Sequence, residues 1–142
     1  MHDSYRTMFY DAVKSVEQIQ GYEIPEQITV YIIMLLASKV DDNRLVPDST
    51  FTETFFKIQT AAEAKQFADN CLFITGVYPN FGQRRGVNRR FLRDLGSIGY
   101  DMTAQKSNPK LFSALSTQFC FLSDFIEQVV NSPKLPRNNL FR

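Results

Sequence analysis

The apolar side chains of this sequence recur at a spacing of three and four residues. Residues at that spacing share one side of an α-helix, because the helix repeats every 3.6 residues. The pattern recurs up to about residue 130, and no convincing pair of strands interrupts it. It predicts an all-α fold, a compact single-domain bundle of five to six helices. In the first helix the apolar side consists of Tyr5, Met8, Phe9, Ala12, Val13, Val16 and Ile19.

Signals at the ends of this first helix agree with its apolar pattern. Asp3 or Ser4 can accept hydrogen bonds from the free N–H groups of the first turn. Gly21 suits the left-handed position that follows many helices. We therefore expect the helix to begin at Asp3 or Ser4 and to end before Gly21.

The next predicted helix, residues 25–40, is apolar around most of its circumference. Pro25 fits a first helical position, since its φ is fixed and it has no N–H to satisfy. A helix that is hydrophobic on nearly all sides is a buried one. We therefore expect this second helix to be the central, buried helix of the bundle.

Capping signals place the remaining helices. Thr50 with Glu53 and Thr60 with Glu63 match the capping box, in which each side chain bonds the other residue's backbone N–H. Further helices are expected over 88–105, and over 108–130 with Asn108 as its N-cap. The helical domain then covers residues 1–131. Residues 132–142, the C-terminal tail, are basic and contain two prolines, which exclude regular helix.

Composition and length indicate an intracellular protein. A chain of 142 residues can form one hydrophobic core without disulfide bonds or a structural metal ion. Cys71 and Cys120 lie in apolar segments, so we expect both thiols to be buried in the core. No signal peptide is visible, and the longest apolar run, residues 30–37, is far shorter than the roughly 18–20 residues of a membrane span. We expect a cytoplasmic location.

Catalytic residue sets are missing from the sequence. The only histidine is His2, and no Glu-x-x-His pair or phosphate-binding glycine loop is present. Asp41 and Asp42 are adjacent and point in different directions in most conformations. With Asn43 they could at best bind a hard cation weakly, and a solvated loop is the simpler interpretation. We expect no enzymatic activity, no metal and no cofactor.

The most unusual cluster of charges is a group of five arginines within ten residues, here called the arginine cluster. Residues 1–78 carry an excess of acidic side chains and residues 79–110 an excess of basic ones. Three arginines of the cluster lie in the first turns of a predicted helix, where the helix dipole disfavours cations. Either internal carboxylates such as Glu63 and Asp69 or an external anion could offset this. The cluster comprises Arg84, Arg85, Arg89, Arg90 and Arg93.

Two further features allow a structural or a functional interpretation. Gly96 and Gly99 lie within one predicted helix, where glycine costs up to about 1 kcal/mol relative to alanine. Close packing against bulky side chains explains them most simply, and a shallow binding groove is the alternative. The tail carries Leu135, Leu140 and Phe141, which could dock onto a partner protein or a second copy of the chain.

One part of the sequence resembles a motif set in an uncharacterised family of small bacterial all-helical proteins. The matching stretches are Leu-Phe-Ile-Thr-Gly-Val-Tyr-Pro at 72–79, Arg-Arg-Gly-Val at 84–87, Asp-Leu-Gly at 94–96, and Tyr100. The resemblance implies no activity. It implies that the corner between the two helices is a unit, in which Arg84 and Arg85 bond helix-end carbonyl groups.

These observations favour a non-enzymatic protein–protein interaction module, a small subunit or adaptor of a bacterial assembly, with a protein partner or a second copy as its target. A first alternative is anion or nucleic-acid binding through the arginine cluster, although the chain as a whole is close to neutral. A second alternative is a helical-bundle carrier of a small ligand, which would need an enclosed apolar pocket.

Overall fold

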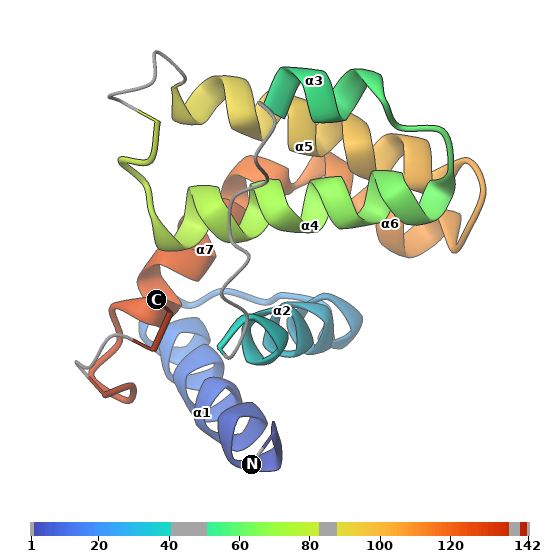
Figure 1. Ribbon diagram of the computed structural model, residues 1–142. Helices are drawn as coiled ribbons and strands as arrows, with labels where there is room; N and C mark the ends of the chain where they lie inside the picture. The colour runs from blue at the N-terminus through green and yellow to red at the C-terminus, as the bar shows by residue number, and fades with distance from the viewer. Residues whose placement is uncertain (1, 41–50, 83–87, 137–139, 142) are drawn as a thin grey trace.

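The computed structural model describes residues 2–40, 51–82, 88–136 and 140–141. Within these ranges the chain forms seven α-helices and no strand, so the all-α prediction is confirmed and the expected count of five to six is too low. Figure 1 shows α1 and α2 on one side of the molecule and α3 to α7 on the other. The helices are α1 (His2–Gln20), α2 (Glu26–Lys39), α3 (Phe51–Phe56), α4 (Ala61–Val77), α5 (Arg89–Ala104), α6 (Pro109–Thr117) and α7 (Phe119–Val130).

Several helix ends lie where the sequence predicts them. Thr60 and Glu63 form the expected capping box at the start of α4. The side chains of Asn88 and Asn108 accept backbone N–H bonds at the starts of α5 and α6. Gly21 has a φ of +71°, the left-handed conformation expected after α1. The start of α1 at His2 is one to two residues earlier than predicted, and the Thr50–Glu53 capping box includes a residue outside the described ranges.

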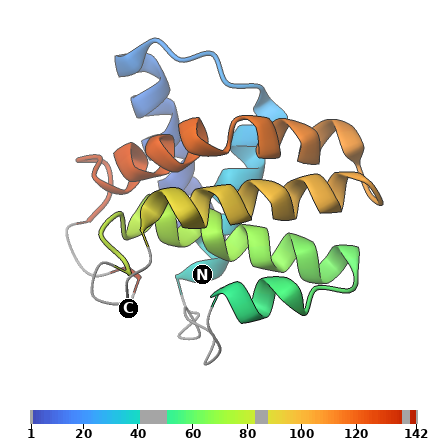
Figure 2. The ribbon, with the colours of Figure 1, turned by 90° about the horizontal axis from the view of Figure 1, so that it is seen from above.

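The central helix is α4, not α2. Its residues 71–76 are all buried, and it packs against both α5 and α7. Figure 2 shows α4 running alongside α5. The outer helix α2 buries one side, including Ile32 and Leu36, but leaves Val30 50% and Met34 44% exposed. The prediction of a central second helix is therefore wrong. An apolar circumference shows what a helix could bury but not which neighbours it has.

The predicted helix over residues 108–130 is two helices. The chain breaks at Gln118, whose φ of −101° and ψ of 18° lie outside the helical region, and α7 begins at Phe119. The break lets α6 pack against α5 while α7 packs against α4 and α1. Two shorter contact faces thus replace one apolar stripe that was too wide for a single face.

Some apolar residues are exposed. Ile19, which the sequence places on the apolar side of α1, faces solvent, and so do Phe91 and Ile98 of α5. Cys71 is buried as predicted, whereas Cys120 is exposed, which corrects the expectation that both thiols lie in the core. Cys120 follows the buried Phe119 by one position, and adjacent helical residues point about 100° apart.

The glycines of α5 are explained by close packing. A Cβ at Gly96 would lie 2.4 Å from Cζ of Phe119 and 2.8 Å from Cβ of Cys71. A Cβ at Gly99 would lie 3.0 Å from Cβ of Ala68. The two positions therefore let α5 approach α4 and α7 closely, and neither forms a groove.

Candidate functional site

The described part of the arginine cluster makes an internal network between α4, α5 and α7. Arg89 donates from Nη2 to Oε1 of Glu127 at 2.8 Å, and the same nitrogen lies 3.5 Å from Oδ1 of Asp124. Arg93 donates from Nη2 to Oδ1 of Asp124 and from Nε to Oγ of Ser123 at 3.3 Å. These contacts place two carboxylates of α7 beside the first turns of α5, where they offset the unfavourable position of two cations.

Arg89 also bonds a helix-end carbonyl group. Its Nε donates to the carbonyl oxygen of Thr75 at 2.9 Å. In a continuing helix that carbonyl would accept from residue 79, but Pro79 has no N–H. Arg89 thus makes a contact of the kind that the resemblance implies for Arg84 and Arg85, and the role of those two residues stays a prediction. Arg84 and Arg85 themselves lie outside the described residues.

A buried chain of hydroxyl groups continues this network into the core. Ser123 donates to Oγ1 of Thr75 at 2.9 Å, and Thr75 donates to the carbonyl oxygen of Cys71 at 2.8 Å. The carboxylates that pair with Arg89 and Arg93 come from α7, not from Glu63 or Asp69 as the sequence suggested. Arg90, the remaining described member of the cluster, is exposed.

The apolar residues of the tail pack against their own chain. Leu135 is 5% exposed, and the ring of Phe141 lies 5.9 Å from that of Phe9 and 5.1 Å from that of Phe73. The hydroxyl of Tyr78 donates to the carbonyl oxygen of Phe141 at 2.8 Å. Leu140 is also partly buried against the core. A docking role for Leu135, Leu140 and Phe141 stays a prediction, and in this structure the three hold the tail to the bundle.

Sequence reasoning missed a polar cluster centred on Asp69. Oδ1 of Asp69 accepts hydrogen bonds from the hydroxyls of Tyr31 at 2.5 Å and of Tyr100 at 2.6 Å. Oδ2 accepts one from Nζ of Lys65 at 3.1 Å. The side chain of Asp69 is only 14% exposed. The cluster therefore joins α2, α4 and α5 through one carboxylate.

The two phenols of this cluster are hydrogen-bond donors at neutral pH. Burial, together with the negative charge of Asp69, raises the pKa of Tyr31 well above its usual range. Burial raises the pKa of Tyr100 as well, and the negative charge of Asp69 adds to the effect. Because both phenols keep their protons, they fix the orientation of the carboxylate.

A cavity of about 220 Å³ opens beside this carboxylate. We call it the Asp69 cavity, and Lys65 is one of its lining residues, with Nζ 5.6 Å from the centre of the Tyr31 ring. Such an arrangement binds a cation through both charge and the face of an aromatic ring. The lining residues are Tyr31, Met34, Leu35, Ser38, Lys65 and Asp69.

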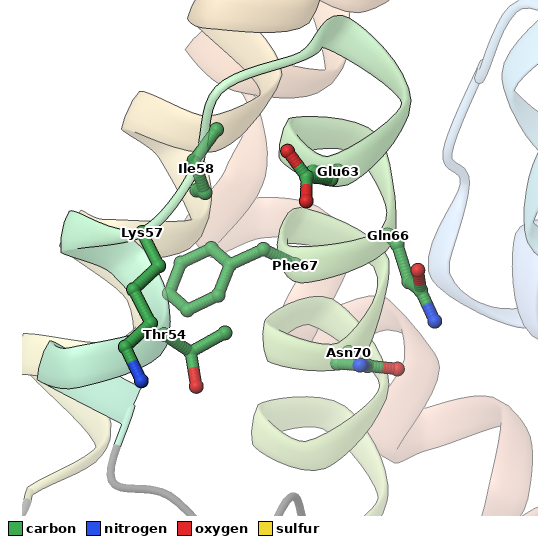
Figure 3. A pocket seen from close by; sticks show the side chains of 7 residues that line it. All are labelled: Thr54, Lys57, Ile58, Glu63, Gln66, Phe67 and Asn70. Atoms are coloured by element: carbon green, nitrogen blue, oxygen red, sulfur yellow. The ribbon is translucent and has the colours of Figure 1, made fainter.

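A second pocket, of about 280 Å³, lies between α3 and α4. Figure 3 shows the ring of Phe67 directed towards Lys57 and Thr54 of the facing segment. Glu63 also lines this pocket, but its Oε1 accepts from the N–H of Gln59 at 3.0 Å and of Thr60 at 3.1 Å. These bonds, led by that from Gln59, hold the pKa of Glu63 below its usual value. Its carboxylate is therefore part of the helix cap.

Within the described ranges, no group of three or more His, Cys, Asp and Glu side chains is placed to hold a metal ion. In the same ranges, no helix combines the length and the apolar character needed to cross a bilayer. Comparisons with protein-family models, with curated proteins and with solved structures each find no match. The resemblance to the bacterial helical family stays a prediction.

Proposed function

We propose that this chain is a non-enzymatic protein–protein interaction module, a small subunit or adaptor of a larger assembly, which binds its partner on the outer face of α2. The observation that carries the proposal is the exposure of Val30 and Met34. They are four residues apart and therefore neighbours on one side of the helix. We call this pair the α2 face.

The α2 face is the uncovered part of a helix whose sequence is apolar on nearly all sides. The opposite side of α2 is buried, with Ile28 at 2% and Ile32 at 0% exposure. Completing the burial of Val30 and Met34 would contribute about 1 kcal/mol each, half of the roughly 1.5–3 kcal/mol for a fully buried side chain of this size. A partner surface would supply that burial.

Two of the five arginines that the first alternative would use, Arg89 and Arg93, are already engaged within the chain. Arg89 and Arg93 donate to Glu127, Asp124 and Ser123, and an external anion would have to displace these acceptors. This favours protein binding on the α2 face over anion binding at the arginine cluster.

The test compares two variants with the natural chain. Val30→Thr/Met34→Gln keeps the side-chain sizes but makes the α2 face polar. Ile19→Gln is the matched control, because Ile19 is an equally apolar, 74% exposed residue on α1. Each tagged chain is expressed in its native cell, and co-purifying proteins are quantified by mass spectrometry. Light scattering of the purified chain measures self-association.

The proposal predicts that a partner, or a second copy, is lost from the α2 variant and retained by the Ile19→Gln control. The proposal is wrong if two results occur together: both variants retain the same proteins at the same level as the natural chain, and light scattering shows that all three purified chains are monomers. It is also wrong if Ile19→Gln causes the same loss as the α2 variant.

A further inference from the structure

We infer that the Asp69 cavity receives the ammonium group of a lysine from the partner, in exchange for Lys65. The inference rests on the proposed function, because it names the chemistry of the partner that covers the α2 face. It is carried by three observations: a carboxylate held in place, an internal lysine that marks the position of a cation, and a lining residue shared with the α2 face.

The carboxylate is held in a fixed orientation before any ligand arrives. Both phenol hydrogen bonds go to Oδ1 of Asp69, from Tyr31 and from Tyr100, and Tyr100 is completely buried. The second oxygen, Oδ2, is left to a cation. A charged acceptor whose position is set by its neighbours binds a donor with little loss of side-chain freedom.

Lys65 shows where a cation fits. Its Nζ lies 3.1 Å from Oδ2 of Asp69 and 5.6 Å from the centre of the Tyr31 ring. These are the two contacts that a partner's lysine would make. The side chain of Lys65 is 46% exposed, so its ammonium group can move into solvent. The incoming ammonium group then takes its place beside Asp69, so the carboxylate keeps a cationic partner.

The cavity is continuous with the α2 face through Met34. Met34 lines the cavity and is also one of the two exposed apolar residues of that face. The methylene stem of an incoming lysine can pack against Met34 and Leu35 while its ammonium group reaches Asp69. The exchange also adds no net charge to the cavity, because one lysine replaces another. The geometry thus favours a partner segment in which a lysine lies beside apolar residues.

The first experiment tests the cavity without the partner. The ¹⁵N-labelled chain is titrated with n-butylammonium, and with n-butanol as a neutral probe of similar size, while the amide signals of residues 31, 34, 65 and 69 are followed. Three variants are titrated alongside. Asp69→Asn removes the charge but keeps an oxygen that can accept the two phenol bonds. Lys65→Met removes the competing ammonium group. Asp101→Asn, on the exposed side of α5, is the control.

The inference predicts saturable shifts at these four amides with n-butylammonium and none with n-butanol. Affinity falls at least tenfold in Asp69→Asn, rises several-fold in Lys65→Met, and is unchanged in Asp101→Asn. Equal responses to the two probes would overturn the inference. So would unchanged affinity in both Asp69→Asn and Lys65→Met. If Asp69→Asn does not fold, an affinity in Lys65→Met no higher than in the natural chain is sufficient to reject it.

The second experiment separates this inference from the proposed function. Asp69→Asn is added to the co-purification series, where it should reduce the amount of the partner that Val30→Thr/Met34→Gln loses. If the α2 variant loses the partner and Asp69→Asn does not, the α2 face binds a partner but the lysine assignment is wrong. If n-butylammonium binds and neither variant affects any protein, the cavity is a site for small amines and both the proposed function and the partner lysine are rejected.

Discussion

Replacing Gly96 with alanine should destabilise the protein, although alanine is the better helix former. In isolation the change would stabilise a helix by about 1 kcal/mol. Here the new methyl group would lie 2.4 Å and 2.6 Å from two ring atoms of Phe119 and 2.8 Å from Cβ of Cys71. Phe119 is 1% and Cys71 0% exposed, so neither can move into solvent. Overpacking of this kind costs about 1–3 kcal/mol. Since both neighbours are fixed, we expect a cost in the upper part of this range, about 2–3 kcal/mol, and subtracting the helix gain of about 1 kcal/mol leaves a net loss of about 1–2 kcal/mol.

The assay is urea unfolding followed by far-ultraviolet circular dichroism. Gly99→Ala is the matched control on the same helix, because its methyl group would meet Ala68 at 3.0 Å, a milder overlap. Its loss should be smaller than that of Gly96→Ala. Phe119→Leu should cost less in the Gly96→Ala background than in the natural chain, because it removes the ring that the methyl group meets. A Gly96→Ala protein as stable as the natural one, or more stable, would refute the packing argument.

Three further predictions concern other parts of the chain. In the folded protein the exposed thiol of Cys120 should react with a thiol reagent. Cys71 should react only after unfolding, because burial raises the pKa of its thiol and blocks access to it. Two rapidly reacting thiols in the folded state would contradict this. Arg89→Met should lower the free energy of unfolding by about 1.5–3 kcal/mol, the range for hydrogen bonds to charged groups. If urea unfolding shows no loss of stability, the contacts of Arg89 with Thr75 and Glu127 contribute nothing. Asn108→Ala should lower the free energy of unfolding by about 1–2 kcal/mol in the same assay, because it removes a helix cap at a residue with a φ of +36°. Asn108→Gly should lower it by only about a few tenths of a kcal/mol, because glycine adopts a positive φ without strain. Equal losses in the two variants would exclude a contribution from the positive φ.

The sequence was most informative where one short segment decides the structure. A capping residue interacts with backbone groups two or three positions away, so Thr60 and Asn108 could be assigned as caps before any packing was known. The all-α class followed in the same way, from the period of the apolar residues. These features depend on local geometry, and the structure confirms them.

Packing partners could not be predicted by the same reasoning. The apolar circumference of α2 indicated complete burial, but burial of Val30 and Met34 depends on neighbours that come from elsewhere. The break at Gln118 is likewise set by the different helices against which α6 and α7 pack. The very wide apolar stripe over residues 108–130 was a local sign that this helix is broken, but it did not show that the break falls at Gln118.

The Asp69 cluster shows why the cavity went unrecognised. Tyr31 and Tyr100 are separated from Asp69 by 38 and 31 residues, so no motif links them. One signal was present in the sequence. Asp69 lies three residues before Leu72 and four before Phe73, both of which are completely buried. A carboxylate next to the buried side of a helix needs partners, and tyrosines are well suited to supply them.

Site-specific photo-crosslinking in the native cell tests the central claim, binding on the α2 face, most directly. A photoreactive side chain is placed at Met34 in one chain and at Ile19 in another, and crosslinked products are identified by mass spectrometry. The account predicts a discrete product at position 34, in which the partner peptide carries a lysine near the crosslink, and no such product at position 19. The absence of any product at position 34, or the same products at both positions, would contradict it.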